Sequence, residues 1–171
     1  MNADRSLASA LCLATLCAAF AGCNHGDTPA GMFPVTNDGG MIAGTEVAIR
    51  DFVIGGGTRD WVREAAPHPS AGPHGRVQTA YNNAYLAARR MDRYPMPVGA
   101  ASAKELFHDD GSHQGWAMSI KVAPGDGAET WVWWEGDAPD YSSRAFGVGV
   151  YSCERCHGDS KRDRSLTATV P

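Results

Sequence analysis

The chain has 171 residues, of which 43% are hydrophobic and 20% are charged, and its formal net charge at pH 7 is −4. These values are ordinary for a globular protein, and the length suits one domain with its own core. The sequence contains no polybasic segment, so nucleic acid is not expected as a partner.

The first 22 residues are predicted to be a signal peptide. Arg5 supplies a positive start, and residues 7–22 form an apolar run that is too short for a comfortable membrane span. The run ends in Phe20-Ala21-Gly22-Cys23, which is typical of a bacterial lipoprotein cleavage site. Either Cys23 is lipidated and anchors the protein to a membrane, or ordinary cleavage nearby leaves it free. Both alternatives predict a periplasmic protein.

Residues 23–44 are rich in Gly, Pro, Asn and Asp and show no hydrophobic periodicity. This composition predicts a flexible tether in front of a domain that spans residues 45–171. The domain opens with residues 46–54, which are apolar enough for a first strand or an irregular packing segment.

The next two elements are a strand over residues 76–81 and a helix that follows it. Asn82 or Asn83 can cap this helix, and Pro95 and Pro97 stop it. The inner stripe of the helix is expected to contain Tyr85, Leu86, Ala88 and Met91. One face of the strand carries Val77, Thr79 and Tyr81, and the other carries Arg76, Gln78 and Ala80.

Three further strands are predicted over residues 101–107, 116–122 and 130–134. The strong turn signal at residues 124–127 joins the last two into a hairpin. The predicted fold is therefore α+β and β-rich. It consists of an antiparallel sheet with one central helix and a short C-terminal helix.

That C-terminal helix carries the sequence Cys153-Glu154-Arg155-Cys156-His157, which has the spacing of a c-type haem attachment site. Two thiols at this spacing can form thioethers with the two vinyl groups on one edge of a porphyrin, and the histidine then binds the iron. A disulfide and half of a zinc site are the alternatives. Zinc needs four ligands, and no second cysteine pair follows the signal peptide. An exported chain favours haem c, because bacterial c-type haem is attached outside the cytoplasm.

With these motifs the chain resembles the cytochrome P-460 family and its relatives, the β-sheet cytochromes c-prime-beta. The resemblance covers roughly residues 50–160. The matching pieces are His74-Gly75, Thr79-Ala80-Tyr81-Asn82 with the helix after it, residues 99–106, the Trp-rich strand and the late haem motif.

The resemblance implies roles for three residues that we treat as catalytic candidates. Lys104 matches the lysine that cytochromes P-460 join covalently to a meso carbon of the haem, although a surface lysine at a strand edge is the alternative. Gln78 aligns with a family arginine, and Arg76 on the same strand face is a second candidate for that distal position. Asp126 and Glu129 are candidates for a distal acid.

The resemblance also implies a haem iron with an open sixth position. Members of the family oxidise hydroxylamine, with nitric oxide chemistry, and pass electrons to an acceptor cytochrome. The c-prime-beta relatives bind nitric oxide or carbon monoxide without turnover. A periplasmic electron carrier, with Met118 or a histidine as sixth ligand, is the third alternative. Relatives are homodimers, so a homodimer is expected, and Trp131, Trp133 and Trp134 serve either its interface or the core and haem pocket.

Overall fold

The computed structural model describes residues 31–167 and 170–171. The predicted signal peptide, Cys23 and the first part of the predicted tether lie outside the described residues. Within the described part, no helix is both long and apolar enough to cross a membrane.

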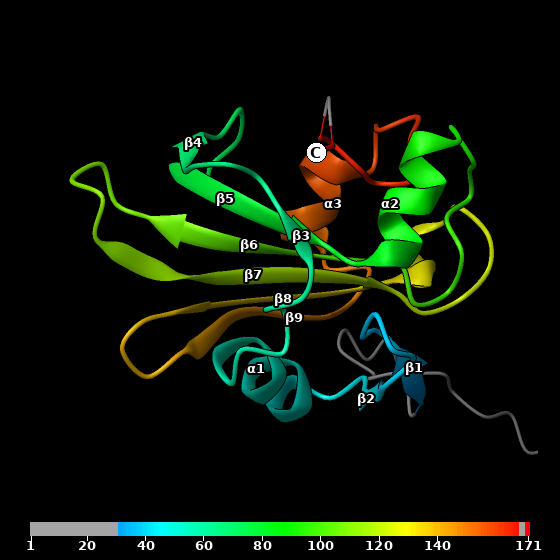
Figure 1. Ribbon diagram of the computed structural model, residues 1–171, viewed down its shortest axis with the longest axis horizontal. Coiled ribbons are helices and arrows are strands. Elements are labelled where there is room, and N and C mark those ends of the chain that lie inside the picture. Colours follow the sequence, from blue (N-terminus) through cyan, green and yellow to red (C-terminus); the bar gives the residue numbers. More distant parts are fainter. Residues whose placement is uncertain (1–30, 168–169) are drawn as a thin grey trace, which may run out of the picture.

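An antiparallel sheet of seven strands forms the centre of the described fold (Figure 1). The strand order is β3-β5-β6-β7-β8-β9, and the short β4 lies beside β5. The predicted α+β, β-rich class is confirmed. The strands are β3 (Val62–Arg63), β4 (His68–Pro69), β5 (Arg76–Tyr81), β6 (Ala101–Phe107), β7 (His113–Lys121), β8 (Trp131–Asp137) and β9 (Ser142–Val148).

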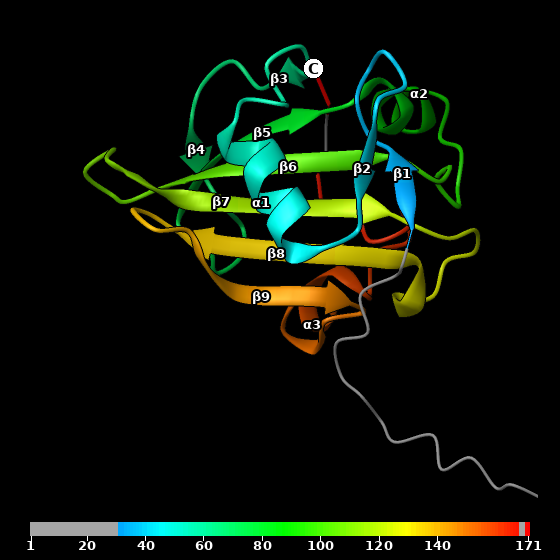
Figure 2. The ribbon, with the colours of Figure 1, turned by 90° about the horizontal axis from the view of Figure 1, so that it is seen from below.

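Different elements cover the two faces of this sheet. One face is covered by helix α1 (Glu46–Ile54) and by the hairpin of β1 (Met32–Pro34) and β2 (Met41–Ala43), as Figure 2 shows. Helices α2 (Asn83–Arg90) and α3 (Tyr151–His157) lie on the other face with the C-terminal segment (Figure 1). A short 3-10 helix, η1 (Ala128–Thr130), precedes β8. The main core lies between the sheet and α1, and the second face is left with room for a cavity.

The predicted tether is corrected in its second half. Residues 32–43 form the β1–β2 hairpin instead of a flexible segment. Phe33 and Val35 are buried in the core beside α1, because this side of the sheet needs apolar cover beyond the length of one short helix. The packed domain therefore begins before residue 45.

The segment predicted as a strand or irregular stretch, residues 46–54, is the helix α1. Its buried side chains, Ile49 and Val53, are one helical turn apart and pack against the sheet. The side chain of Thr45 caps the helix by accepting a hydrogen bond from the Ala48 amide at 3.3 Å. The capping residue and the four-residue spacing both favour a helix over a strand.

Asn82 is the cap of α2, as predicted, and it also ties two other segments to this helix. Its Oδ1 accepts from the amides of Tyr85 at 2.9 Å and Ala101 at 3.0 Å. Its Nδ2 donates to the carbonyls of Val35 at 2.9 Å and Gly99 at 2.7 Å. The predicted inner stripe holds for Tyr85, Leu86 and Ala88, which are buried, and fails for Met91, which is 61% exposed.

The strands predicted over residues 76–81 and 101–107 coincide with β5 and β6. The strand predicted over 116–122 lies within the longer β7 except for its last residue, and β7 and β8 form the predicted hairpin. The sequence did not predict β9, whose serines and exposed arginine give little hydrophobic alternation.

Candidate functional site

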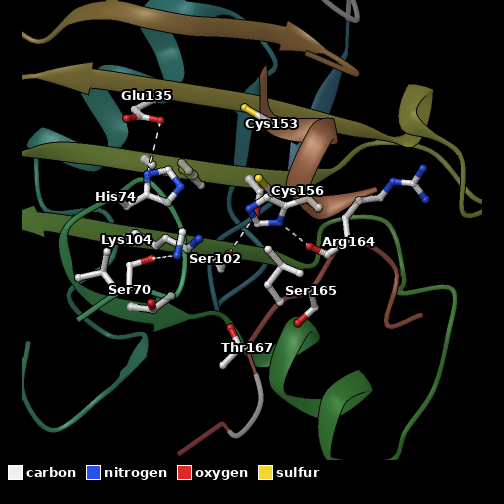
Figure 3. Close-up of a pocket in the computed structure, with 18 of the residues that line it drawn as sticks. Ser70, His74, Ser102, Lys104, Glu135, Cys153, Cys156, Arg164, Ser165 and Thr167 are labelled. Atoms are coloured by element: carbon white, nitrogen blue, oxygen red, sulfur yellow. Dashed lines mark hydrogen bonds and ion pairs between the residues drawn. The ribbon is translucent and has the colours of Figure 1, made fainter. Parts of the chain in front are cut away.

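A cavity of about 670 Å³ lies on the face of the sheet opposite α1 (Figure 3). The sheet forms its floor, and its walls are the loop of residues 68–74, helix α3 and residues 164–167. This volume is within the range of sites that bind small molecules and cofactors.

Four residues of the floor stand in one row across the sheet. Thr79 of β5 is opposite Lys104 of β6, Lys104 is opposite Ala117 of β7, and Ala117 is opposite Glu135 of β8. Residues that oppose one another in neighbouring strands point to the same face, so all four side chains line the cavity. The register of the sheet thus brings together residues that are far apart in the chain.

Lys104 extends from an interior strand into the cavity. Strand β6 lies between β5 and β7, so the alternative of a surface lysine at a strand edge is wrong. Among the described residues, the Lys104 ammonium has no hydrogen-bond or salt-bridge partner. Burial lowers the pKa of Lys104 below its usual value, against the opposing influence of the Glu135 charge. A larger share of this amine is therefore neutral than in a solvated lysine.

Helix α3 brings the predicted attachment residues, Cys153, Cys156 and His157, to the same cavity. Both cysteines are free thiols, which gives no support to the disulfide alternative. Burial raises the pKa of Cys153 to about 11, so its thiol is protonated near neutral pH. The part of the chain that the structure describes contains no group of three or more His, Cys, Asp or Glu side chains arranged for a metal ion, which gives no support to a zinc site.

His157 is held by its Nδ1 atom, which lies 2.6 Å from the backbone carbonyl oxygen of Arg164. A carbonyl oxygen can only accept, so Nδ1 is the protonated nitrogen and Nε2 keeps its lone pair. Burial, together with the Lys104 charge, lowers the pKa of His157 to about 4, so the ring is neutral near pH 7. The ring of Trp133 packs beside the imidazole at 4.6 Å between centroids. The site therefore presents a fixed, neutral imidazole with one available nitrogen.

Glu135 is a cavity acid that the sequence analysis missed. Its carboxylate lies 3.7 Å from Nδ1 of His74 (Figure 3). It also forms an ion pair with Arg144. Burial acts to raise the pKa of Glu135, but the nearby His74 ring and the Arg144 charge outweigh it and hold this pKa below its usual value. The alternation of β8 contained the signal, because Glu135 follows Trp131 and Trp133 on the same face.

A second acid of the cavity wall, Glu64, was also missed. It accepts hydrogen bonds from the Thr79 amide at 2.7 Å and the Tyr81 hydroxyl at 2.9 Å. It also pairs with Nε2 of His68 at 3.0 Å. Glu64 precedes the proline-containing loop and lies in no regular element, so no sequence period marked it.

The distal candidates from the sequence do not line the cavity. Arg76 donates to the carbonyl of Pro67 at 3.0 Å, and Gln78 donates to the carbonyl of Glu64 at 2.7 Å. Both residues belong to the face of β5 opposite Val77 and Thr79, whose side chains do line the cavity. Asp126 and Glu129 are also outside the lining, in the segment before β8.

The tryptophans of β8 serve the core and the cavity. All three border the cavity, and Trp134 also belongs to the core on the α1 side. All three are buried, so the structure favours core and pocket packing over a dimer interface. Met118 belongs to the α1-side core and also borders the cavity.

No protein-family model matches this chain, and no curated protein matches it. The resemblance to cytochromes P-460 therefore stays a prediction, and the residues and geometry above are its support.

Proposed function

We propose that the cavity binds a c-type haem, with Cys153 and Cys156 as the thioether attachments and His157 as the proximal iron ligand. The observation that carries this proposal is the convergence of three groups. Two free thiols and one imidazole with an available Nε2 reach a single cofactor-sized cavity from one short helix.

Helix α3 itself supports an occupant in the cavity. It has only seven residues, none of them is fully buried, and no side chain caps its first turn. A helix this short is unstable on its own, so its position requires contacts outside the helix. A planar porphyrin between α3 and the sheet would supply such contacts through apolar lining residues such as Val77, Ala117 and Trp133. The residues present therefore fit the group.

A haem iron supplies a binding position for small molecules and one-electron redox chemistry. We propose that the substrate is hydroxylamine or nitric oxide and that electrons leave to an acceptor cytochrome. Each N–H or O–H bond lost by hydroxylamine releases a proton with its electron. Glu135, held as a carboxylate beside His74, is a cavity group that can accept such a proton. In this proposal, the residues at this end of the cavity bind hydroxylamine and accept the protons that it loses.

We further propose that Lys104 forms a third covalent bond to the haem. The bond joins Nζ to a meso carbon and replaces one N–H and one C–H bond. Two protons and two electrons leave, and a peroxide is the class of oxidant that would take the electrons. The free amine that points into the cavity, on the floor opposite α3, supports this assignment.

A haem protein that binds nitric oxide or carbon monoxide without turnover is the second candidate. It is favoured by the positions of Arg76 and Gln78, whose side chains bond to backbone carbonyls outside the cavity lining. The resemblance placed the distal arginine of the cross-linked relatives at Gln78. The electron carrier has less support, because Met118 belongs to the α1-side core and His68 and His74 are paired with Glu64 and Glu135. For each candidate we propose the periplasm as the compartment, with a lipid anchor at Cys23 and a homodimer as the further expectations.

The test is expression together with the c-type haem assembly machinery, followed by a haem-stained denaturing gel and an absorption spectrum. The native chain is expected to keep its haem under denaturing conditions. Changing both Cys153 and Cys156 to Ala should abolish this retention, whereas Cys23→Ser should leave it intact. A red-shifted Soret band and hydroxylamine oxidation would favour the enzyme, and an ordinary spectrum with nitric oxide binding would favour the second candidate. A colourless native protein would refute both.

A further inference from the structure

A fully buried ion pair links strand β7 to the segment that follows α3. The ammonium of Lys121 lies 2.9 and 2.8 Å from the two carboxylate oxygens of Asp163, and both side chains are at most 1% exposed. No part of the proposed chemistry uses this pair. A buried charge pair is costly to desolvate and is a weak source of stability, so its presence calls for another explanation.

Every polar atom of the pair has a partner. The Asp163 carboxylate also accepts from the Trp131 indole at 3.0 Å and from the Met96 amide at 2.7 Å. The Lys121 ammonium also donates to the Thr130 hydroxyl at 2.9 Å and to the carbonyl of Gly125. These contacts fix Asp163 from several directions at once, so the backbone at this position has very little freedom.

The backbone that the pair fixes has an unusual conformation. Asp163 and Arg164 have φ angles of 51° and 63°, and two consecutive non-glycine residues in the left-handed region are uncommon. Such a conformation persists only where surrounding contacts impose it. Here the turn directs the carbonyl of Arg164 at Nδ1 of His157, which lies 2.6 Å away. A second contact on the same turn joins the Arg164 guanidinium to Glu154 of α3 at 3.1 Å.

We propose that Lys121 and Asp163 are positioning residues for His157. Their ion pair holds the left-handed turn, and the turn holds the carbonyl that sets the orientation and tautomer of the imidazole. The inference rests on the proposed function for its effect at the iron. A hydrogen bond accepted from Nδ1–H makes a histidine ligand more basic, which strengthens its bond to iron and favours the ferric state.

The test compares two variants of the full chain. Lys121→Met combined with Asp163→Asn removes both charges without leaving one of them buried and alone, and Asn can still bond to Trp131 or Met96. Val53→Ala is the control, because it weakens the core on the opposite face and touches no residue of the turn. Thermal unfolding shows whether the two variants are destabilised to a similar extent.

Two readouts follow the proposed role. In the haem-free protein, NMR of isotope-labelled histidine should show one His157 tautomer, protonated at Nδ1, in the native chain and in Val53→Ala. The double variant should show a mixture of tautomers. In the haem-loaded protein, the double variant should lower the iron–histidine stretching frequency and raise the reduction potential, and the control should change neither.

The outcomes separate this proposal from the proposed function. A double variant with the native tautomer and stretching frequency would overturn the positioning role, as would a control that shifts equally. A native chain that binds no haem would refute the proposed function, and the tautomer measurement on the haem-free protein would still decide the role of the pair.

Discussion

Lys104 and Glu135 lie in one row of the sheet, separated only by the small side chain of Ala117. Their opposite charges attract, and the Glu135 charge partly offsets the effect of burial on the Lys104 pKa. Because alanine fills little of the space between them, the cavity floor stays open at this point. The row therefore combines an amine, a carboxylate and a gap for a small molecule on a rigid base.

Replacing Lys104 should change the haem spectrum without releasing the haem. In Lys104→Ala the Soret band should take the ordinary c-type position, because the amine of the proposed cross-link is gone and both cysteines remain. Hydroxylamine oxidation should fall by about tenfold or more. Lys104→Arg is the matched control for charge, since it keeps the cation and cannot form the same bond. A native spectrum that is unchanged in both variants would contradict the cross-link.

Enlarging Ala117 should close the gap between Lys104 and Glu135. In Ala117→Leu the affinity of the ferrous haem protein for carbon monoxide should fall by about tenfold, because overpacking removes the space for a ligand. Ala145→Leu is the control, since Ala145 continues the same row opposite Glu135 and lies outside the cavity lining. Titration with carbon monoxide measures both. Equal affinities in the two variants would show that the ligand binds elsewhere.

Glu135 should stabilise the fold in a pH-dependent way. Because its folded-state pKa is lowered, its contribution is present above the unfolded-state pKa and is lost as the pH falls through the folded-state value. Near pH 7, Glu135→Gln should reduce the free energy of unfolding by about 1 kcal/mol. Urea unfolding of the haem-free protein should show this difference shrinking toward acidic pH. A difference that stays constant or grows on acidification would rule out an ionised Glu135 in the fold.

Asn82 should be among the most sensitive positions for stability. Asn82→Ala leaves two amides and two carbonyls without their side-chain partner, and we expect a loss of about 3–5 kcal/mol in the free energy of unfolding. Asn82→Ser is the informative comparison, since its hydroxyl oxygen can still cap the helix and the bonds donated by Nδ2 are lost. Urea unfolding should therefore rank Ser between the native residue and Ala. A loss below about 1 kcal/mol in Asn82→Ala would contradict this account.

Much of the second face of the sheet could be predicted from the sequence. The two-residue period placed β5 and β6 correctly, and the Asn82 cap placed α2. The spacing of Cys153, Cys156 and His157 depends on one helical turn, so it identified candidate ligands without knowledge of the rest. These features are local, and local patterns are what a sequence displays directly.

The features that the sequence analysis missed depend on contacts between distant segments. Glu135 enters the cavity because β8 pairs with β7 in one particular register, and no local pattern states that register. Arg76 and Gln78 were considered as distal residues on alignment alone. The alternation of their own strand already placed them on the face opposite Val77 and Thr79. The structure shows that the face with Val77 and Thr79 is the one that lines the cavity.

No residue of α3 is fully buried, and this has a consequence for how the protein is assembled. The strands pair without any bond from α3, so the sheet can form before the helix docks on it. An attachment enzyme would then act on the accessible peptide of α3, before this helix packs over the sheet. Haem attachment and the final folding step would then be coupled, because the bound haem would fill the space between the sheet and α3.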